Sequence, residues 1–402
     1  MAEKENHIVL RKPENSQISS LKNEIRTSKK YKKQNAVVVI TFILLVIIYF
    51  FSVTSFVVPE NTSFSLAGLL QAWKDKFHSF ILFVGGEGSY GTGTVVKYTI
   101  MMLAGAALAS AGAVFQGSFK NIIASPATMG VQSGATLGNA LYLLFFTSSV
   151  SSATGVVKIH NDVTETSKMS FAQLNTQQLF AMVGSFIAIV TVVAITSALG
   201  KGRFSTTNIL FSGMIFSSFV GAITSLINNY FLFYDEDNSR AQSMQTFSMG
   251  NFDRVITVQQ LAFIAAFLVP CLIVLIVTSS KLNVLVMGEE EAATMGLNVR
   301  FYRNLLIAVG TLMSATVFAF CGQIGFMGFI VPQIARKLVG PDFKRLIVMT
   351  VGLGGLLMIL VYNVAFAFGL TTYLNIIIST IGCLMMIYSF FKGKGGVAAD
   401  AE

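Results

Sequence analysis

The sequence predicts an all-α polytopic membrane protein with about ten transmembrane helices. Three observations support this fold class: of 402 residues, 53% are hydrophobic, only 12% are charged, and the mean hydropathy is +0.68. A soluble globular chain carries about 25% charged residues, and a membrane-spanning helix needs about 20 apolar residues. The composition therefore excludes a disordered chain, a disulfide scaffold and almost any soluble enzyme.

Ten apolar segments are candidate spans. They are residues 36–58, 95–115, 127–147, 178–199, 207–233, 256–279, 304–322, 324–339, 346–370 and 373–391. The eighth is short and contains Pro332, which weakens it as a single helix. We expect a transmembrane domain over 36–391, preceded by a basic N-terminal tail over 1–35 and followed by a C-terminal tail over 392–402.

The distribution of basic residues predicts the orientation. With both ends in the cytoplasm, the inner segments hold 21 Lys and Arg residues and the outer segments hold seven. Such an excess of basic residues on the inside is typical of multi-pass membrane proteins. It also explains the net charge of +9 better than nucleic-acid binding does.

The predicted spans carry no Asp, Glu, Lys or Arg well inside them. Transporters coupled to ion gradients usually keep ionisable residues at membrane depth, so an external energy source is favoured over an ion-coupled secondary transporter. A membrane-embedded enzyme would need clustered His, Asp or Glu near a membrane face, and the inner segments offer only Glu289–Glu291. The three cysteines and three histidines form no metal-binding pattern, and no disulfide is expected.

Small residues recur in two of the spans, over Leu103–Gly112 and Gly134–Gly138. Such spacing allows helix backbones to approach closely, so these residues predict helix packing and no chemistry. The sequence contains no Walker A motif, which predicts that this chain does not hydrolyse nucleotide itself.

The inner loop 281–300 is the most informative connection. Glu289, Glu290 and Glu291 are suited to open a short helix, where the macrodipole favours negative charge. Ala292, Ala293 and Met295 continue it, and Gly296 can adopt the left-handed conformation that ends it. The residues alone fit a plug for a partner's groove and an interfacial helix without a partner equally well.

This loop resembles the "ALGEexAxxLGv" segment of the FecCD family, the permeases of type II ABC importers for vitamin B12, haem and ferric siderophores. Further blocks resemble that family in the same order, between about residues 95 and 391. They are Gly105–Gly117, Asn121–Pro126, Gly130–Ala135, Ile324–Arg336 and Val339–Asp342. Together these blocks are highly specific, although each alone is weak.

The resemblance implies ten helices per subunit and a pore between two permease subunits in a bacterial plasma membrane. It also implies two cytoplasmic ATPase subunits, which bind ATP and Mg²⁺, and an extracytoplasmic substrate-binding protein. This chain would be a transport subunit with no enzyme activity, cofactor or metal of its own. The residues that would couple it to the ATPase are Gly288, Glu289, Glu290, Glu291, Ala292, Ala293, Met295 and Gly296.

The resemblance also assigns an inner gate, which maps onto Thr206 and Thr207. A pair of hydroxyl groups can form a narrow polar constriction without binding cargo tightly. A helix N-cap at the start of the fifth span explains the same residues at least as well.

The sequence departs from the family pattern where the binding protein docks. Of two family arginines at the outer start of span two, only one basic residue remains, Lys97, which is our docking candidate; the alternative is a snorkelling lysine. Ala367 and Asn363 stand where the family has Arg and Asp. The cluster Asp235–Asp237 could dock instead, although a solvated loop tip explains it better.

Two more departures concern the last span and the loops. Residues 374–386 lack the family's two prolines, and the N-terminal tail and the loop 148–177 are longer than typical. This asymmetry predicts a heterodimer with a second, more conventional permease. For the cargo we favour a ferric siderophore or another iron complex, on family frequency, with haem and cobalamin as alternatives.

Overall fold

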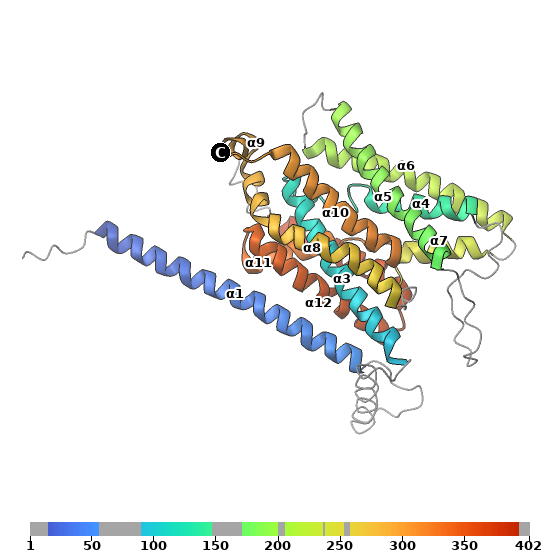
Figure 1. The fold of residues 1–402 in the computed structure, drawn as a ribbon, viewed down its shortest axis with the longest axis horizontal. Coiled ribbons are helices and arrows are strands. Elements are labelled where there is room, and N and C mark those ends of the chain that lie inside the picture. The colour runs from blue at the N-terminus through green and yellow to red at the C-terminus, as the bar shows by residue number, and fades with distance from the viewer. Residues whose placement is uncertain are drawn as a thin grey trace, which may run out of the picture.

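The computed structural model describes residues 15–55, 90–146, 171–199, 206–235, 238–252 and 258–393. Within these ranges the chain is helical and contains no strand (Figure 1). The elements are α1 (Asn15–Ser55), α3 (Tyr90–Ser118), α4 (Val131–Phe146), α5 (Phe171–Leu199), α6 (Thr206–Tyr234), α7 (Ser239–Met249), α8 (Val258–Met287), α9 (Glu289–Thr294), α10 (Val299–Cys321), α11 (Met327–Val339), α12 (Phe343–Ala367), the 3₁₀ turn η1 (Thr371–Tyr373) and α13 (Leu374–Gly393).

Each of the ten predicted spans corresponds to a helix, which confirms the all-α polytopic fold class. In the described part of the chain, seven helices are long and apolar enough to cross a membrane by themselves. Helix α11 has 13 residues and is therefore about 20 Å long, against a hydrocarbon thickness of about 30 Å. Pro332 lies inside this short helix.

Helix α1 extends beyond the predicted first span and into the basic N-terminal tail. It has 41 residues, so at 1.5 Å per residue it is about 62 Å long and continues into the polar tail as far as Asn15. Its N-terminal part stands away from the bundle in Figure 1. Apolar periodicity could not reveal this part, because its Lys, Glu and Arg residues favour a helix by propensity alone.

Helix α3 forms the centre of the bundle and contacts α8, α10, α11 and α12. Its glycines allow this close packing. A Cβ atom at Gly105 would lie 2.3 Å from the carbonyl oxygen of Gly354 on α12, and one at Gly112 would lie 1.9 Å from that of Gly328 on α11. The prediction that residues 103–112 serve packing is confirmed.

A second group of helices, α4 to α7, lies beside this core. Gly134 on α4 and Gly184 on α5 face each other so closely that a Cβ on either would meet the other's carbonyl oxygen, which confirms the packing role of Gly134–Gly138. Helix α7 was not predicted. Its polar sequence and its 11 residues carry no signal of a membrane span.

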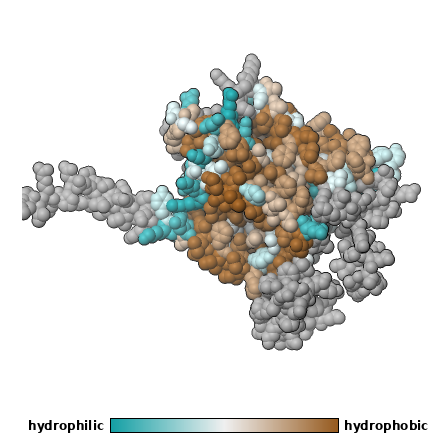
Figure 2. Space-filling view, in the orientation of Figure 1, coloured by the Kyte–Doolittle hydropathy of each residue, from teal (hydrophilic) through white to brown (hydrophobic). Residues whose placement is uncertain are grey.

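The molecular surface is apolar around the middle of the bundle (Figure 2). Exposed side chains such as Ile47 on α1, Ile187 on α5 and Phe219 on α6 contribute to this surface. Hydrophilic residues gather near α9 and where α1 meets the bundle. This distribution suits a protein whose lateral surface contacts lipid.

Residues 322–326 interrupt the helical path between α10 and α11. Gly322 and Phe326 both have positive φ, at 75° and 60°. Side chains and neighbouring backbone satisfy the freed polar groups: Asn375 accepts a hydrogen bond from the Gly325 amide at 2.8 Å, and the Gln323 amide donates to Phe247 O at 2.8 Å. Irregular backbone inside a membrane protein needs such internal partners.

Candidate functional site

The predicted short helix in the loop 281–300 is present as α9, between α8 and α10. It begins at Glu289, as expected, and Gly296 follows it with a φ of 76°. The amide of Leu297 donates to Ala292 O at 3.1 Å, and that of Gly296 donates to Ala293 O at 2.9 Å. These two bonds form a Schellman motif, which fixes the end of the helix.

One face of α9 is anchored and the other is free of the bundle. Ala292 is fully buried, and Gly288 is buried beneath the carboxylate of Glu291. Glu290, Ala293, Met295 and Gly296 are exposed, with Met295 at 60%. The side chain of Glu289 lies outside the described part of the structure. The result is a small, rigid knob that presents an apolar methionine beside acidic side chains.

A polar network holds the base of α9. Asn283, near the end of α8, donates to Asp342 at 2.7 Å, and its side-chain oxygen accepts from the Phe343 amide at 2.8 Å. Asp342 also caps α12 by accepting from the Lys344 amide at 3.1 Å. Helix α8, which precedes α9, is thus tied to the start of α12.

Residues of two family-like blocks, Gly105–Gly117 and Ile324–Arg336, meet at this same end of the bundle, which we call the α9 end. Arg336 on α11 hydrogen-bonds through its guanidinium to the side chain of Gln116 on α3. Gln116 in turn donates to Gly328 O at 3.3 Å. The ring of Phe343 packs against Gly117, where a Cβ would lie 2.8 Å away. Segments more than 200 residues apart therefore build one scaffold.

The opposite end, which we call the α7 end, carries a polar cavity of about 780 Å³. Helices α4, α6 and α7 form its walls. The lining residues are Thr136, Thr224, Ser225, Asn228, Asn229, Leu232, Asn238, Ala241, Gln242, Met244, Gln245 and Ser248. All of these lining residues are uncharged, and most end in an amide or a hydroxyl group. We call this space the amide cavity.

The amide cavity contains an unsatisfied acceptor. The side-chain oxygen of Asn228 is buried and has no hydrogen-bond partner within the described structure. Buried polar groups normally have partners, so an orphan acceptor in a cavity of ligand size indicates a place where water or a ligand donates. Gln323 donates to the lining residue Thr136 and accepts from Gln132 at 3.0 Å, which joins the wall of the cavity to the interrupted segment 322–326.

Thr206 and Thr207, the predicted gate, are the first two residues of α6. Their side chains lie outside the described part of the structure, so the gate remains a prediction. The position still matters, because α6 also lines the amide cavity at its other end. With 29 residues, this helix is about 43 Å long and joins the two places directly.

Lys97, the predicted docking residue, is half-buried near the start of α3. Its ammonium group donates to the hydroxyl of Tyr362 on α12 at 3.0 Å and lies 5.4 Å from the centre of that ring. Asn363, where the family has Asp, accepts from Tyr98 at 2.9 Å and donates to Ser52 at 2.6 Å. These contacts tie α1, α3 and α12 together, a role that the sequence did not reveal.

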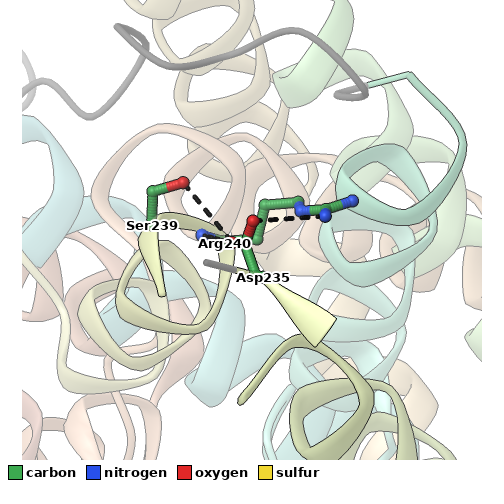
Figure 3. A network of polar contacts seen from close by, with 3 residues as sticks. All are labelled: Asp235, Ser239 and Arg240. Atoms are coloured by element: carbon green, nitrogen blue, oxygen red, sulfur yellow. Dashed lines mark hydrogen bonds and ion pairs between the residues drawn. The ribbon is translucent and has the colours of Figure 1, made fainter. Parts of the chain in front are cut away.

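The acidic cluster after α6 is partly described. Asp235 forms a salt bridge of 3.2 Å with Arg240 and accepts from the Arg240 backbone amide at 3.0 Å and from Ser239 (Figure 3). Partial burial alone would raise the pKa of Asp235, but these hydrogen bonds outweigh it and lower the pKa. Asp235 therefore caps the turn into α7, while residues 236 and 237 lie outside the described structure.

The His, Cys, Asp and Glu side chains are dispersed among the described residues. No group of three or more His, Cys, Asp and Glu side chains there could hold a metal ion. Cys271 and Cys321 are buried free thiols, and Cys383 is an exposed one.

Comparisons with known proteins agree with the architecture. The family model of the FecCD transport family matches residues 44–392. The cobalamin import system permease of Halobacterium salinarum is 32% identical over 74% of this chain and 72% of its own length. The hemin transport system permease of Yersinia pestis is 26% identical over 62% of this chain and 67% of its own.

A solved structure shares the fold. It is an inward-facing conformation of a metal-chelate type ABC transporter and covers 89% of this chain and 99% of its own, with a TM-score of 0.67 and 23% sequence identity.

Proposed function

Because the chain belongs to the FecCD transport family and is an ABC importer permease, we propose that it forms half of the translocation pathway for a ferric siderophore or another iron complex. Transport would be driven by ATP hydrolysis in a separate subunit. ATP and Mg²⁺ would be bound by that ATPase, and this chain would hold no cofactor of its own.

The amide cavity carries this proposal. Its volume of about 780 Å³ is of the size that binds small molecules, and its lining side chains are uncharged. Amides and hydroxyls can exchange hydrogen bonds with a large organic chelate without holding it by charge. An uncharged wall favours a chelate whose metal charge is already neutralised by its ligands. A cobalamin or haem, as named for the relatives, is the alternative cargo.

Helix α9 suits coupling to the ATPase. A knob must be rigid to transmit the closure of a partner, and α9 is fixed by its Schellman motif and by the Asn283–Asp342 contact. Its exposed face, with Glu290, Ala293 and Met295, would enter a groove on that partner. The α9 end would then face the cytoplasm, and with it the segments 1–35 and 392–402.

The gate and the docking site complete the proposed pathway. Thr206 and Thr207 would close the cytoplasmic end of the pathway along α6. At the other end, Lys97 would pair with a carboxylate on the binding protein, and its bond to Tyr362 would hold the ammonium group in place. Because the matching charges are absent at Asn363 and Ala367, a second permease with a full set would complete the docking surface as a heterodimer.

Co-purification from the native host tests the assembly. A tagged chain extracted in mild detergent should bring down two ABC ATPase subunits, a second permease and a substrate-binding protein. Two copies of this chain with no other permease would contradict the heterodimer. Loss of every ATPase under conditions that keep the complex intact would contradict the ATP-driven mechanism.

A variant of α9 tests the coupling role. Met295→Asp, at an exposed position, should reduce recovery of the ATPase at least about tenfold, because it places a charge in an apolar contact. Tyr373→Asp is the matched control, since Tyr373 is exposed at 42% in η1, outside α9. Equal recovery of the ATPase by both variants would remove α9 from the interface.

Uptake into proteoliposomes tests the cargo. The reconstituted complex with its binding protein should import a ferric siderophore only when ATP is enclosed on the ATPase side. Import of cobalamin or haem, with no import of ferric siderophores, would overturn the iron assignment and leave the permease function standing.

A further inference from the structure

A second cavity, of about 550 Å³, lies on the side of the bundle, and we call it the lateral groove. Four elements form it: the segment at the end of α3, the second half of α5, the start of α6 and the first turns of α10. Its residues are Ser118, Phe119, Lys120, Phe186, Ile189, Val190, Val193, Ala194, Ile209, Arg303, Asn304, Ile307, Ala308 and Thr311. It shares no residue with the amide cavity.

The walls of the lateral groove are apolar and open to the side of the bundle. Val190 and Ala194 on α5 and Ala308 on α10 are exposed, while Ile189 beneath them is buried. Because α5 exposes Val183, Ile187 and Val190 beside the groove, the groove opens on an apolar side of the bundle, where acyl chains would surround the protein. Water would fill such an apolar space poorly.

One end of the groove is basic and polar. Lys120 and Arg303 both line it, and they come from the end of α3 and the start of α10, at the α9 end of the bundle. Ser118, beside Lys120, has a buried hydroxyl oxygen with no hydrogen-bond partner in the described structure. Two cations and an orphan hydroxyl thus stand at the mouth of an apolar channel.

The backbone at Lys120 is unusual. The Asn121 amide donates to Gln116 O at 3.0 Å and the Lys120 amide donates to Gly117 O at 3.3 Å, so α3 ends in a Schellman-type turn. Lys120 occupies the left-handed position of this turn, with a φ of 48°. Glycine is the usual residue there, and a lysine costs about 1–2 kcal/mol of backbone strain. A strained residue at a polar mouth suggests that its side chain has a use.

We propose that the lateral groove binds an anionic phospholipid. One acyl chain would lie between α5 and α10, and the phosphate of the head group would pair with Lys120 and Arg303 and accept a hydrogen bond from Ser118. Basic pockets between transmembrane helices on one side of a membrane bind anionic head groups in this way. The apolar walls favour a lipid over free phosphate, which would contact only the mouth. The site would let membrane composition stabilise the α5–α10 contact, whatever the cargo.

Native mass spectrometry tests the proposal. The purified complex is equilibrated in detergent micelles with phosphatidylglycerol or phosphatidylcholine, and bound lipids are counted. Each basic residue near an anionic lipid contributes about fivefold in affinity. The double variant Lys120→Gln with Arg303→Gln should therefore bind phosphatidylglycerol about 25-fold more weakly and leave phosphatidylcholine unchanged.

Two further variants separate the explanations. Arg300→Gln with Lys344→Gln removes two exposed cations outside the groove and should leave binding within about twofold. Val193→Trp fills the groove but keeps both charges, and it should also abolish retention of phosphatidylglycerol.

Three outcomes would overturn the lipid site. The first is normal binding of phosphatidylglycerol by the Lys120 and Arg303 double variant. The second is a loss of lipid by the control pair as large as that of the double variant. The third is retention of the lipid by Val193→Trp. If Val193→Trp keeps phosphatidylglycerol and inorganic phosphate displaces it, the result would instead identify a phosphate site at the mouth. Val193→Trp and Arg303→Gln alone keep the test decisive if the double variant fails to fold.

Discussion

Helices α3 and α6 have the same length and nearly the same mean hydropathy, but they differ in how deeply they are buried. Each has 29 residues, and the spans within them have mean hydropathies of 1.7 and 1.8. In its most apolar window, α3 has 83% of residues buried, whereas α6 has 28%. One helix is the centre of the packed core, and the other borders the amide cavity and the lipid-facing surface.

The glycines of the two helices account for part of the difference. Gly105 and Gly112 on α3 lie against the backbones of α12 and α11, whereas a Cβ at Gly221 on α6 would meet nothing within 4 Å. Hydropathy reports only that a helix suits a membrane. The partner of each glycine reports the packing of its own part of the helix: near the start of α6, a Cβ at Gly213 would lie 2.4 Å from the Thr128 carbonyl oxygen, whereas the region around Gly221 borders open space.

Removal of a packing glycine should have the largest effect. Gly112→Leu would drive its side chain into the Gly328 carbonyl, 1.9 Å from the Cβ position, so α3 and α11 must separate. We expect a loss of more than about 3 kcal/mol and little folded protein in detergent, measured by size-exclusion chromatography. Gly221→Ala is the control and should behave as wild type. Normal recovery of Gly112→Leu would show that the core is not tightly packed.

A change in the amide cavity should impair transport and leave the fold intact. Asn228→Leu removes an acceptor from the cavity wall, and we expect uptake by proteoliposomes to fall about tenfold, with unchanged thermal stability. Leu226→Ala, at a 70% exposed position on the same helix, should transport normally. If Asn228→Leu lowered thermal stability as well as uptake, the role of Asn228 would be structural.

Much of the fold could be predicted from the sequence. The ten apolar segments, the small-residue packing at Leu103–Gly112 and the capped helix ending at Gly296 were all expected, because each depends on local patterns of hydropathy or backbone preference. The helical extension of α1 and the polar helix α7 were missed, since neither has apolar periodicity.

The functional surfaces were harder to predict because they depend on distant segments. Residues of α4, α6 and α7 form the amide cavity only after folding, and no single stretch of sequence marks it. The partner of Lys97 lies 265 residues away on α12. In the sequence, Asn363 stands out only because the family has a charged Asp at this position. In the structure, its side chain joins α1 to α3 through hydrogen bonds with Ser52 and Tyr98.

A smaller effect should follow the loss of one bond in the Tyr98–Asn363–Ser52 contact. Tyr98→Phe leaves the Asn363 carbonyl without its donor at 2.9 Å, and such hydrogen bonds between membrane helices contribute about 0.6 kcal/mol on average. We expect a decrease of that size in the free energy of unfolding, measured by titration with denaturing detergent. The exposed Tyr373→Phe should show no change. Equal stability of Tyr98→Phe and wild type would remove this contact from the core's stabilisation.

The smallest effect should come from Asp235, in the turn between α6 and α7. Its pKa is lower in the folded protein than the ordinary 3.8, so its contribution is fully present above that pH and is lost as the pH falls through the folded value. Asp235→Asn should destabilise the protein by about 0.5 kcal/mol at neutral pH and by less as the pH falls below 3.8. A difference between the two proteins that stays constant from pH 7 to about pH 3 would contradict this capping role.

Labelling of introduced cysteines tests the central claim most directly. This claim is that the cargo passes along α6, while the packing around α3 is too tight to admit cargo or solvent. Cys271, Cys321 and Cys383 are first replaced by serine or alanine, and single cysteines are placed at Asn229 and Gln242 in the amide cavity and at Thr350, which is buried against α3. A membrane-impermeant thiol reagent should label the two cavity positions, saturating cargo should slow that labelling, and Thr350→Cys should not react. Labelling of Thr350→Cys, with no effect of cargo at the two cavity positions, would contradict the account.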